Sequence, residues 1–202
     1  MTEFFEVLDT DGAARTAELR IEPPLRTPAR VGDRVVVAGS RWVAERAVPP
    51  LDAASLTILP HRGFPAGTDE RVIAAFPSAE TDQTGATAAV VTAGSASSVD
   101  ADVYVLSDAP GMMGHAAAMV EAIITLREQT PADTGLYLAG CADALNVAML
   151  VYAGVDLVDA TAAAAAGYDG RYQTAMGTMP AAEVTERPCM CPVCAEGTGP
   201  LD

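Results

Sequence analysis

Short, continuous apolar runs recur along the chain and alternate with longer, helix-like stretches. Six of the runs are mostly β-branched, and they span residues 34–38, 56–59, 88–91, 103–106, 136–138 and 155–158. A strand that is buried on both faces has this continuous pattern, whereas a strand with one solvated face alternates. Helices are predicted between the runs at residues 70–76, 115–129 and 143–152. The pattern therefore predicts an α/β protein in which βα repeats build a parallel sheet.

The segment before the first run has a different pattern. Residues 4–8 and 17–21 lie on either side of Asp11-Gly12, a typical hairpin turn, so a β-hairpin is predicted ahead of the sheet. The predicted strands are fewer than the eight of a full (β/α) barrel, which takes about 250 residues. We therefore expect a shortened or incomplete TIM-like barrel, organised as an N-terminal β layer (1–26), a βα domain (27–178) and a cysteine-containing tail (179–202).

Length and hydropathy indicate where the protein acts. The chain has 202 residues, 50% of them hydrophobic, which is enough for a substantial core. No apolar run approaches the ~20 residues that cross a bilayer, and the first residues have no basic segment of the kind that opens a signal peptide. We therefore expect a cytoplasmic protein with no membrane partner.

The charge balance is unusual. All 12 basic residues are arginine, against 27 acidic residues, and the formal net charge is −15. A surface without lysine and rich in Asp and Glu suits concentrated salt, in which repulsion between carboxylates is screened. The composition therefore indicates a halophilic protein, and an ordinary acidic protein from a GC-rich genome is the alternative. In ordinary salt this charge would argue against binding nucleic acid, but in molar salt that argument loses most of its force.

Three of the four cysteines lie close together near the end of the sequence. Cys189, Cys191 and Cys194 have the spacing C-x-C-x-x-C. Thiolates at this spacing can converge on one ion, and Zn²⁺ prefers four soft or borderline ligands in a tetrahedron. The spacing predicts a structural Zn²⁺ site whose fourth ligand is not in the cluster. A redox pair of Cys191 and Cys194, or a reduced tail without metal, is the alternative.

Both halves of the chain carry stretches that resemble the tRNA-guanine transglycosylase family. Residues 5–15, followed by 26–29 (RTPA), resemble the family's small β layer and the first strand of its barrel. Residues 136–140 (LYLAG) and 154–159 (GVDLVD) resemble two later strands at a similar separation, and the cysteine cluster falls where the family places its zinc site. The resemblance implies a transglycosylase-type barrel that is shortened in its middle.

Within this family, the haloarchaeal archaeosine synthases are the branch that the chain resembles. Residues 38–43 (AGSRWV) and 150–159 carry this likeness. That branch converts preQ0 at position 15 of tRNA to archaeosine, so the resemblance implies tRNA carrying preQ0 or guanine at position 15 as a partner. It also implies a catalytic lysine in a later domain and a histidine as fourth zinc ligand, beyond the cysteines. The sequence has no lysine, and its histidines are His61 and His115. We therefore expect a second chain that carries the C-terminal domains.

The resemblance also implies site residues. Asp159 matches the family's nucleophile, a carboxylate that attacks ribose C1′, and it closes a predicted strand, where a barrel carries its active site. A helix N-cap is the alternative role for Asp159. Ser107 and Asp108 match the loop with which the family grips the base. Gly140 and Cys141 either line the base pocket or merely turn the strand.

These observations predict a transglycosylase-like module for archaeosine biosynthesis that is not competent by itself. The segment after Asp159, residues 160–171, is alanine-rich, and it matches an arginine-bearing loop for tRNA in the family whose basic contacts have here largely become alanine. A non-catalytic, zinc-stabilised binding or assembly module and a truncated, inactive gene product are the alternatives. Whether the chain forms a homo-oligomer stays open.

Overall fold

Seven parallel strands form the central sheet of the computed structural model, in the order β4-β10-β9-β8-β7-β6-β5. The structure describes residues 3–37, 55–59, 69, 71–72, 85–94, 96, 100–174 and 176–186. The strands are β4 (Ala29–Arg30), β5 (Val35–Val37), β6 (Leu56–Ile58), β7 (Thr87–Val91), β8 (Val103–Leu106), β9 (Gly135–Leu138) and β10 (Leu157–Val158).

The sheet is strongly curled, and the chain itself requires this. The two edge strands, β4 and β5, are consecutive in sequence and separated only by residues 31–34, which include the 3-10 turn η1 (Gly32–Arg34). A flat sheet of seven strands would hold its edges about 29 Å apart, because neighbouring strands lie about 4.8 Å apart. The connection from Arg30 to Val35 reaches only about 18 Å at full extension. The edges are therefore drawn together, and the sheet fits an incomplete TIM-like α/β fold.

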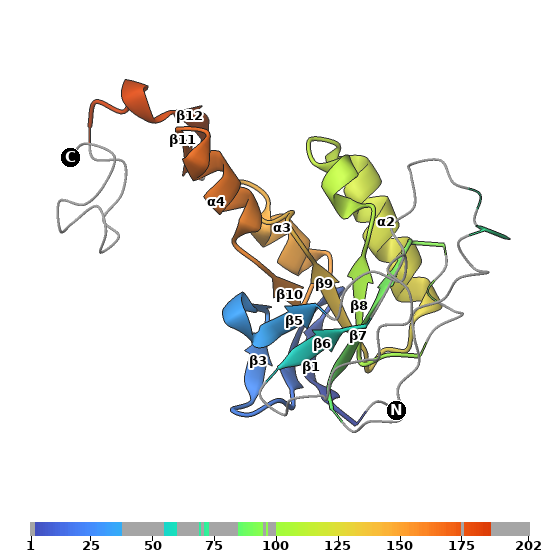
Figure 1. Ribbon diagram of the computed structural model, residues 1–202. Coiled ribbons are helices and arrows are strands. Elements are labelled where there is room, and N and C mark those ends of the chain that lie inside the picture. The colour runs from blue at the N-terminus through green and yellow to red at the C-terminus, as the bar shows by residue number, and fades with distance from the viewer. Residues whose placement is uncertain are drawn as a thin grey trace.

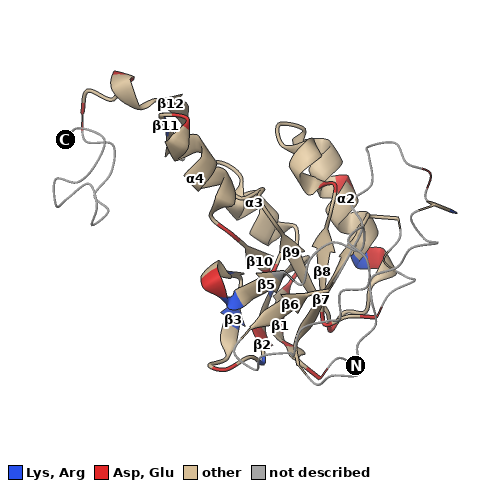
Figure 2. Cartoon of the chain, viewed as in Figure 1, with Lys and Arg blue, Asp and Glu red and all other residues tan. Residues whose placement is uncertain are grey.

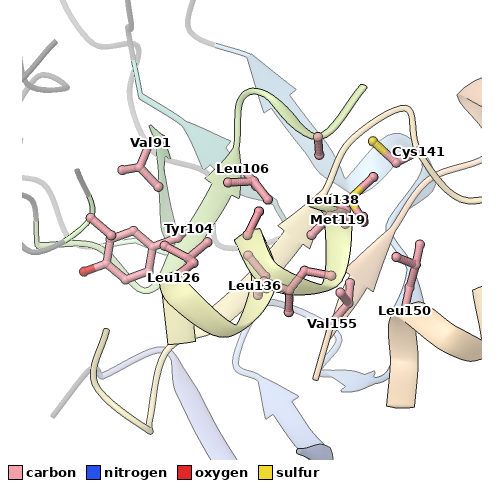
Figure 3. Close-up of a cluster of buried hydrophobic side chains, with 14 of the residues drawn as sticks. Val91, Tyr104, Leu106, Met119, Leu126, Leu136, Leu138, Cys141, Leu150 and Val155 are labelled. Atoms are coloured by element: carbon pink, nitrogen blue, oxygen red, sulfur yellow. The ribbon is translucent and has the colours of Figure 1, made fainter. Parts of the chain in front are cut away.

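The central strands β6, β7, β8 and β9 are buried on both faces at nearly every position, which explains their continuous apolar runs. Inside the curl, Val103, Val105, Tyr137 and Leu157 belong to one buried cluster. The alternating residues on the outer face belong to a second cluster, beneath α2 (Ala116–Gln129) and α3 (Val147–Tyr152) (Figure 3). Helix α2 contributes four buried side chains to it, Met119, Ala122, Ile123 and Leu126.

A second, antiparallel sheet closes the amino end of the curled sheet. It consists of β1 (Phe5–Asp11), β2 (Ala14–Leu19) and β3 (Leu25–Thr27), and the predicted hairpin is the pair β1 and β2. Phe5 lies so close to Gly135, the first residue of β9, that a Cβ atom there would be 2.9 Å from its ring. Phe5 and Leu19 join the same buried cluster as the interior of the curl.

A buried ion-pair cluster joins this layer to the curled sheet. The Asp156 carboxylate, 0% exposed, accepts hydrogen bonds from Arg15 Nε (2.8 Å), from Arg127 Nη2 (2.5 Å) and from the backbone N–H of Leu136 (2.7 Å). Burial lowers the pKa of Arg127 to about 10, against the attraction of Asp156, so the guanidinium stays charged at neutral pH. Asp156 therefore joins β2, α2 and β9 through one buried carboxylate.

The last described elements extend away from the sheet. Helix α4 (Thr161–Tyr168) and the hairpin of β11 (Arg171–Thr174) and β12 (Gly177–Pro180) project to one side (Figure 1). Helix α4 has no buried residue, and Tyr168 at its end is 94% exposed. Figure 2 shows acidic positions scattered over the described chain and far fewer basic ones.

Several boundaries differ from the prediction. Helix α3 begins at Val147 instead of residue 143, because Asp143 Oδ1 accepts the backbone N–H groups of Leu145 and Asn146 in a turn that precedes the helix. The hydrophobic pattern did not predict the short strands β3 and β4, although the resemblance at residues 26–29 implied a strand there, and the β11–β12 hairpin was not predicted. Of the predicted helix at residues 70–76, the structure describes only Arg71 and Val72, both helical.

No helix among the described residues is long and apolar enough to cross a membrane.

Candidate functional site

Asp159 lies at the carboxyl end of β10, at the mouth of the curled sheet. Along this strand Leu157 points into the curl and Val158 packs against the outer cluster, so the alternation returns Asp159 to the inner side. The Tyr137 hydroxyl donates to Asp159 Oδ2 (2.7 Å), and the backbone N–H of Gly140 donates to the same oxygen (2.9 Å). Strand β9 and its terminal turn therefore orient the carboxylate.

These donors keep Asp159 ionised. Partial burial by itself raises the pKa of this carboxyl, but the hydrogen bonds from Tyr137, Thr161 and Gly140 outweigh it, and the net pKa lies below the usual value. The same contact has the opposite effect on its partner: burial and the neighbouring carboxylate raise the pKa of Tyr137. Tyr137 therefore remains a hydroxyl donor, and Asp159 remains an anion with a fixed orientation.

The alternative role of Asp159 at a helix start is also visible. Its second oxygen, Oδ1, accepts the backbone N–H of Thr161 (2.8 Å), the first residue of α4, whereas the cap residue Ala160 makes no side-chain cap bond. The two roles use different oxygens of one carboxylate. Asp159 thus supports the start of α4 and at the same time faces the mouth of the sheet.

An open groove of about 550 Å³ runs beside Asp159 between α3, α4 and β11. Its lining includes two acidic, two basic and two further residues: Asp143, Asp159, Arg30, Arg171, Val158 and Gln173. Arg30 ends β4 and Arg171 begins β11, so segments far apart in sequence meet here. The groove is large enough for one nucleotide and places two guanidinium groups on the same depression as the carboxylate.

Gly140 and Cys141, which follow β9, occupy different environments. Gly140 has a φ of +70°, a conformation that favours glycine, and its N–H holds Asp159. Cys141 is buried in the outer cluster, where its Sγ donates to the Ala139 carbonyl oxygen (3.1 Å). Burial raises the pKa of Cys141 to about 11, so the thiol is protonated at neutral pH. Gly140 is therefore adjacent to the carboxylate, and contact of either residue with a base stays a prediction.

Ser107 and Asp108 follow the carboxyl end of β8, at the same end of the sheet as Asp159 but two strands away from β10. Both are exposed, and Asp108 precedes the 3-10 turn η3 (Ala109–Met112) without forming a side-chain cap bond. Desolvation raises the pKa of Asp108 above its usual value. Neither Ser107 nor Asp108 is among the described residues that line the groove beside Asp159. A substrate contact through them stays a prediction.

Tyr137, Arg30 and Arg171 are side chains beside Asp159 or its groove that sequence reasoning missed. Tyr137 lies inside an apolar run, a pattern typical of a core residue, but a buried tyrosine hydroxyl usually needs a hydrogen-bond partner. Arg30 follows the RTPA stretch and Arg171 ends the alanine-rich segment, so no local pattern connects them. Of the three, only Tyr137 could have been found from the sequence, through its hydroxyl group in an otherwise apolar run.

The predicted zinc ligands Cys189, Cys191 and Cys194 lie outside the described residues. Within the described ranges, no group of three or more His, Cys, Asp or Glu side chains is arranged to hold a metal. The three thiols are the donor type that Zn²⁺ prefers.

Comparisons with known proteins agree with this geometry. A sequence profile of the family described as queuine tRNA-ribosyltransferase matches residues 86–198, more than half of the chain. An archaeosine synthase of Haloferax volcanii is 48% identical over 194 residues, which are 96% of this chain and 33% of that protein. The archaeosine synthase subunit alpha of Methanosarcina acetivorans is 32% identical over 98% of this chain and 36% of its own length.

A tRNA-guanine(15) transglycosylase of Methanococcus aeolicus is 32% identical over 50% of this chain and 16% of its own length. The chain thus spans about a third of the length of the two archaeosine synthases.

Proposed function

Because the chain belongs to the queuine tRNA-ribosyltransferase family, we propose that it acts in archaeosine biosynthesis, as the transglycosylase-like module of an archaeosine synthase. Its substrate in this proposal is tRNA with preQ0 or guanine at position 15. The observation that carries the proposal is the oriented, ionised carboxylate of Asp159, which opens onto a nucleotide-sized groove at the carboxyl end of a parallel sheet.

The chemistry follows from the charge and position of that carboxylate. One Asp159 oxygen would attack ribose C1′, forming a C–O bond as the bond from C1′ to the base breaks and the base departs with that electron pair. A second base would then attack C1′ through a ring nitrogen and release the carboxylate, and the proton that this nitrogen loses would pass to the departed base. Tyr137 and Gly140 hold Oδ2, so they position the nucleophile and limit its rotation.

Any step that needs a lysine lies outside these 202 residues, because the sequence contains none. The proposal therefore includes a second component that supplies the amidine-forming step. The Methanosarcina relative carries the words "subunit alpha" in its name, which is compatible with such a division in that protein.

The proposal also includes one Zn²⁺ held by Cys189, Cys191 and Cys194, as their spacing predicts. Metal analysis by mass spectrometry of the purified chain and of its triple Ser variant tests it. We expect up to one Zn²⁺ per chain in the wild type, released readily by a chelator because one ligand is absent from the cluster. Equal zinc in both proteins would refute this part.

The catalytic part is tested by incubating the chain in molar KCl with preQ0-containing tRNA, with and without a partner that supplies the remaining domains. Nucleosides are then analysed by mass spectrometry. We expect archaeosine only with the partner, its loss in Asp159→Asn and its retention in Asp9→Asn, which removes an exposed carboxylate from β1 in the N-terminal antiparallel sheet. Circular dichroism of each variant checks that it is folded.

Two results would contradict the proposal. Archaeosine formed by this chain alone would refute the dependence on a partner. Archaeosine formed at the wild-type rate by Asp159→Asn would refute the nucleophilic role and favour a non-catalytic binding module.

A further inference from the structure

We propose that Arg30 and Arg171 bind the phosphates next to the nucleotide whose ribose reaches Asp159, so that the groove is a ribose-phosphate site. This inference rests on the proposed function and adds to it the residues that hold the RNA backbone. Both arginines line the groove together with Asp159, one from β4 and one from β11.

The two guanidinium groups are available to a ligand. Among the described residues, neither Arg30 nor Arg171 has a side-chain hydrogen bond or ion pair, whereas Arg15 and Arg127 are committed to Asp156. Both groove arginines are also exposed. In a chain with 27 acidic residues and 12 basic ones, two unpaired arginines on one depression are a local exception to the surrounding negative charge.

Among the described residues, the two carboxylates of the groove form no ion pair with Arg30 or Arg171, and they accept hydrogen bonds from other donors. Asp143 Oδ1 accepts the N–H groups of Leu145 and Asn146. Both oxygens of Asp159 accept donors from Tyr137, Gly140 and Thr161. The two guanidinium groups therefore remain open to an anion from solvent. A planar fork matches two phosphate oxygens at once.

The rest of the groove suits a ribose rather than a second charge. Val147, Val158 and Ala163 give it an apolar wall. Gln173 lines the same groove, and its carboxamide Oε1 is buried without a hydrogen-bond partner among the described residues. An unpaired buried acceptor is costly, and a turn of this carboxamide toward the groove would let a ribose 2′-OH satisfy it. The groove therefore offers cations, an apolar surface and an acceptor for the three parts of a ribonucleotide backbone.

This arrangement explains how an acidic chain with an alanine-rich segment after Asp159 holds RNA. Each phosphate neutralised on a single strand contributes about −0.7 to the slope of log K against log salt, so two contacts contribute about −1.4. Losing one arginine should reduce the slope by about 0.7 and weaken binding by about ten-fold, as expected for a lost charge-assisted hydrogen bond.

The test measures binding of a fluorescently labelled tRNA transcript by anisotropy across a KCl series, with the full chain. Arg30→Gln and Arg171→Gln are compared with Arg26→Gln, a control that removes an exposed arginine from β3 in the N-terminal sheet. We expect a shallower slope and weaker binding for the two groove variants and wild-type behaviour for Arg26→Gln. DNA of the same sequence should bind more weakly than RNA, and Gln173→Leu should abolish that preference.

The outcomes separate this inference from the proposed function. If both groove variants bind tRNA as tightly as the wild type does, the arginine assignment is overturned and the proposed function stands. A wild-type chain that binds no tRNA at any KCl concentration overturns both. Polyglutamate that competes as well as RNA overturns the ribonucleotide assignment in favour of a general anion site, and an RNA preference that survives Gln173→Leu overturns the 2′-OH contact.

Discussion

Replacing Asp156 by Asn tests the strongest electrostatic feature of the fold. The carboxylate is 0% exposed, and its two arginine partners, Arg15 and Arg127, have side chains that are 8% and 20% exposed. Asn has nearly the same volume, so the substitution opens no cavity. It removes the negative charge and places an NH₂ donor beside two guanidinium groups that are themselves only donors.

The expected cost follows from the burial of the cluster. Breaking a buried ion pair by removing one partner costs about 3 to 5 kcal/mol, because the remaining charge is left uncompensated. A protein of this size loses about 2 to 4 °C in Tm for each kcal/mol. Asp156→Asn should therefore lower the Tm by roughly 6 to 20 °C. Since buried charges are screened little by salt, the loss should persist in molar KCl.

Thermal unfolding followed by circular dichroism, at several KCl concentrations, measures this effect. The control is Asp9→Asn, which removes an exposed carboxylate from β1 and should change the Tm by about 2 °C or less. A Tm for Asp156→Asn within this control range would refute the reasoning. A loss that disappears in molar KCl would show that the cluster behaves as a surface ion pair.

Three further predictions concern the site, a turn and the solvent. Tyr137→Phe removes a hydrogen-bond donor, so the pKa of Asp159 should rise. The stabilisation from this carboxylate is present above the unfolded pKa and is lost as the pH falls through the lower folded pKa, so in the variant it should be lost at a higher pH. An unchanged ¹³C NMR titration of Asp159 would contradict this. Gly154→Ala should cost at least about 2 kcal/mol in urea unfolding, because Gly154 has a φ of +99° and a Cβ there would lie 2.8 Å from the Ala13 carbonyl oxygen, whereas Gly111→Ala, with open space and no such φ, should cost much less. The Tm of the wild type should rise steeply from low to molar KCl because its net charge is −15, and a flat Tm would refute the halophilic interpretation.

The amino-acid sequence by itself determined the class of the fold and most strands of the sheet. The runs at residues 88–91, 103–106 and 136–138 correspond to β7, β8 and β9, because a strand buried on both faces must be apolar at consecutive positions. The N-terminal hairpin was predictable for a similar local reason, its Asp-Gly turn. Asp159 could be singled out because it ends a strand within a recognisable stretch.

Contacts between distant segments were decided only by the tertiary structure. Strand β4 has two residues and no pattern of its own, and its pairing with β10 depends on the curl of the whole sheet. The meeting of Arg30, Asp159 and Arg171 in one groove depends on the same curl and on the direction in which α4 leaves β10. The partners of Asp156 are equally distant in sequence. Hydrophobic periodicity records which face of an element is buried, whereas the identity of its neighbour is set by how all the elements pack together.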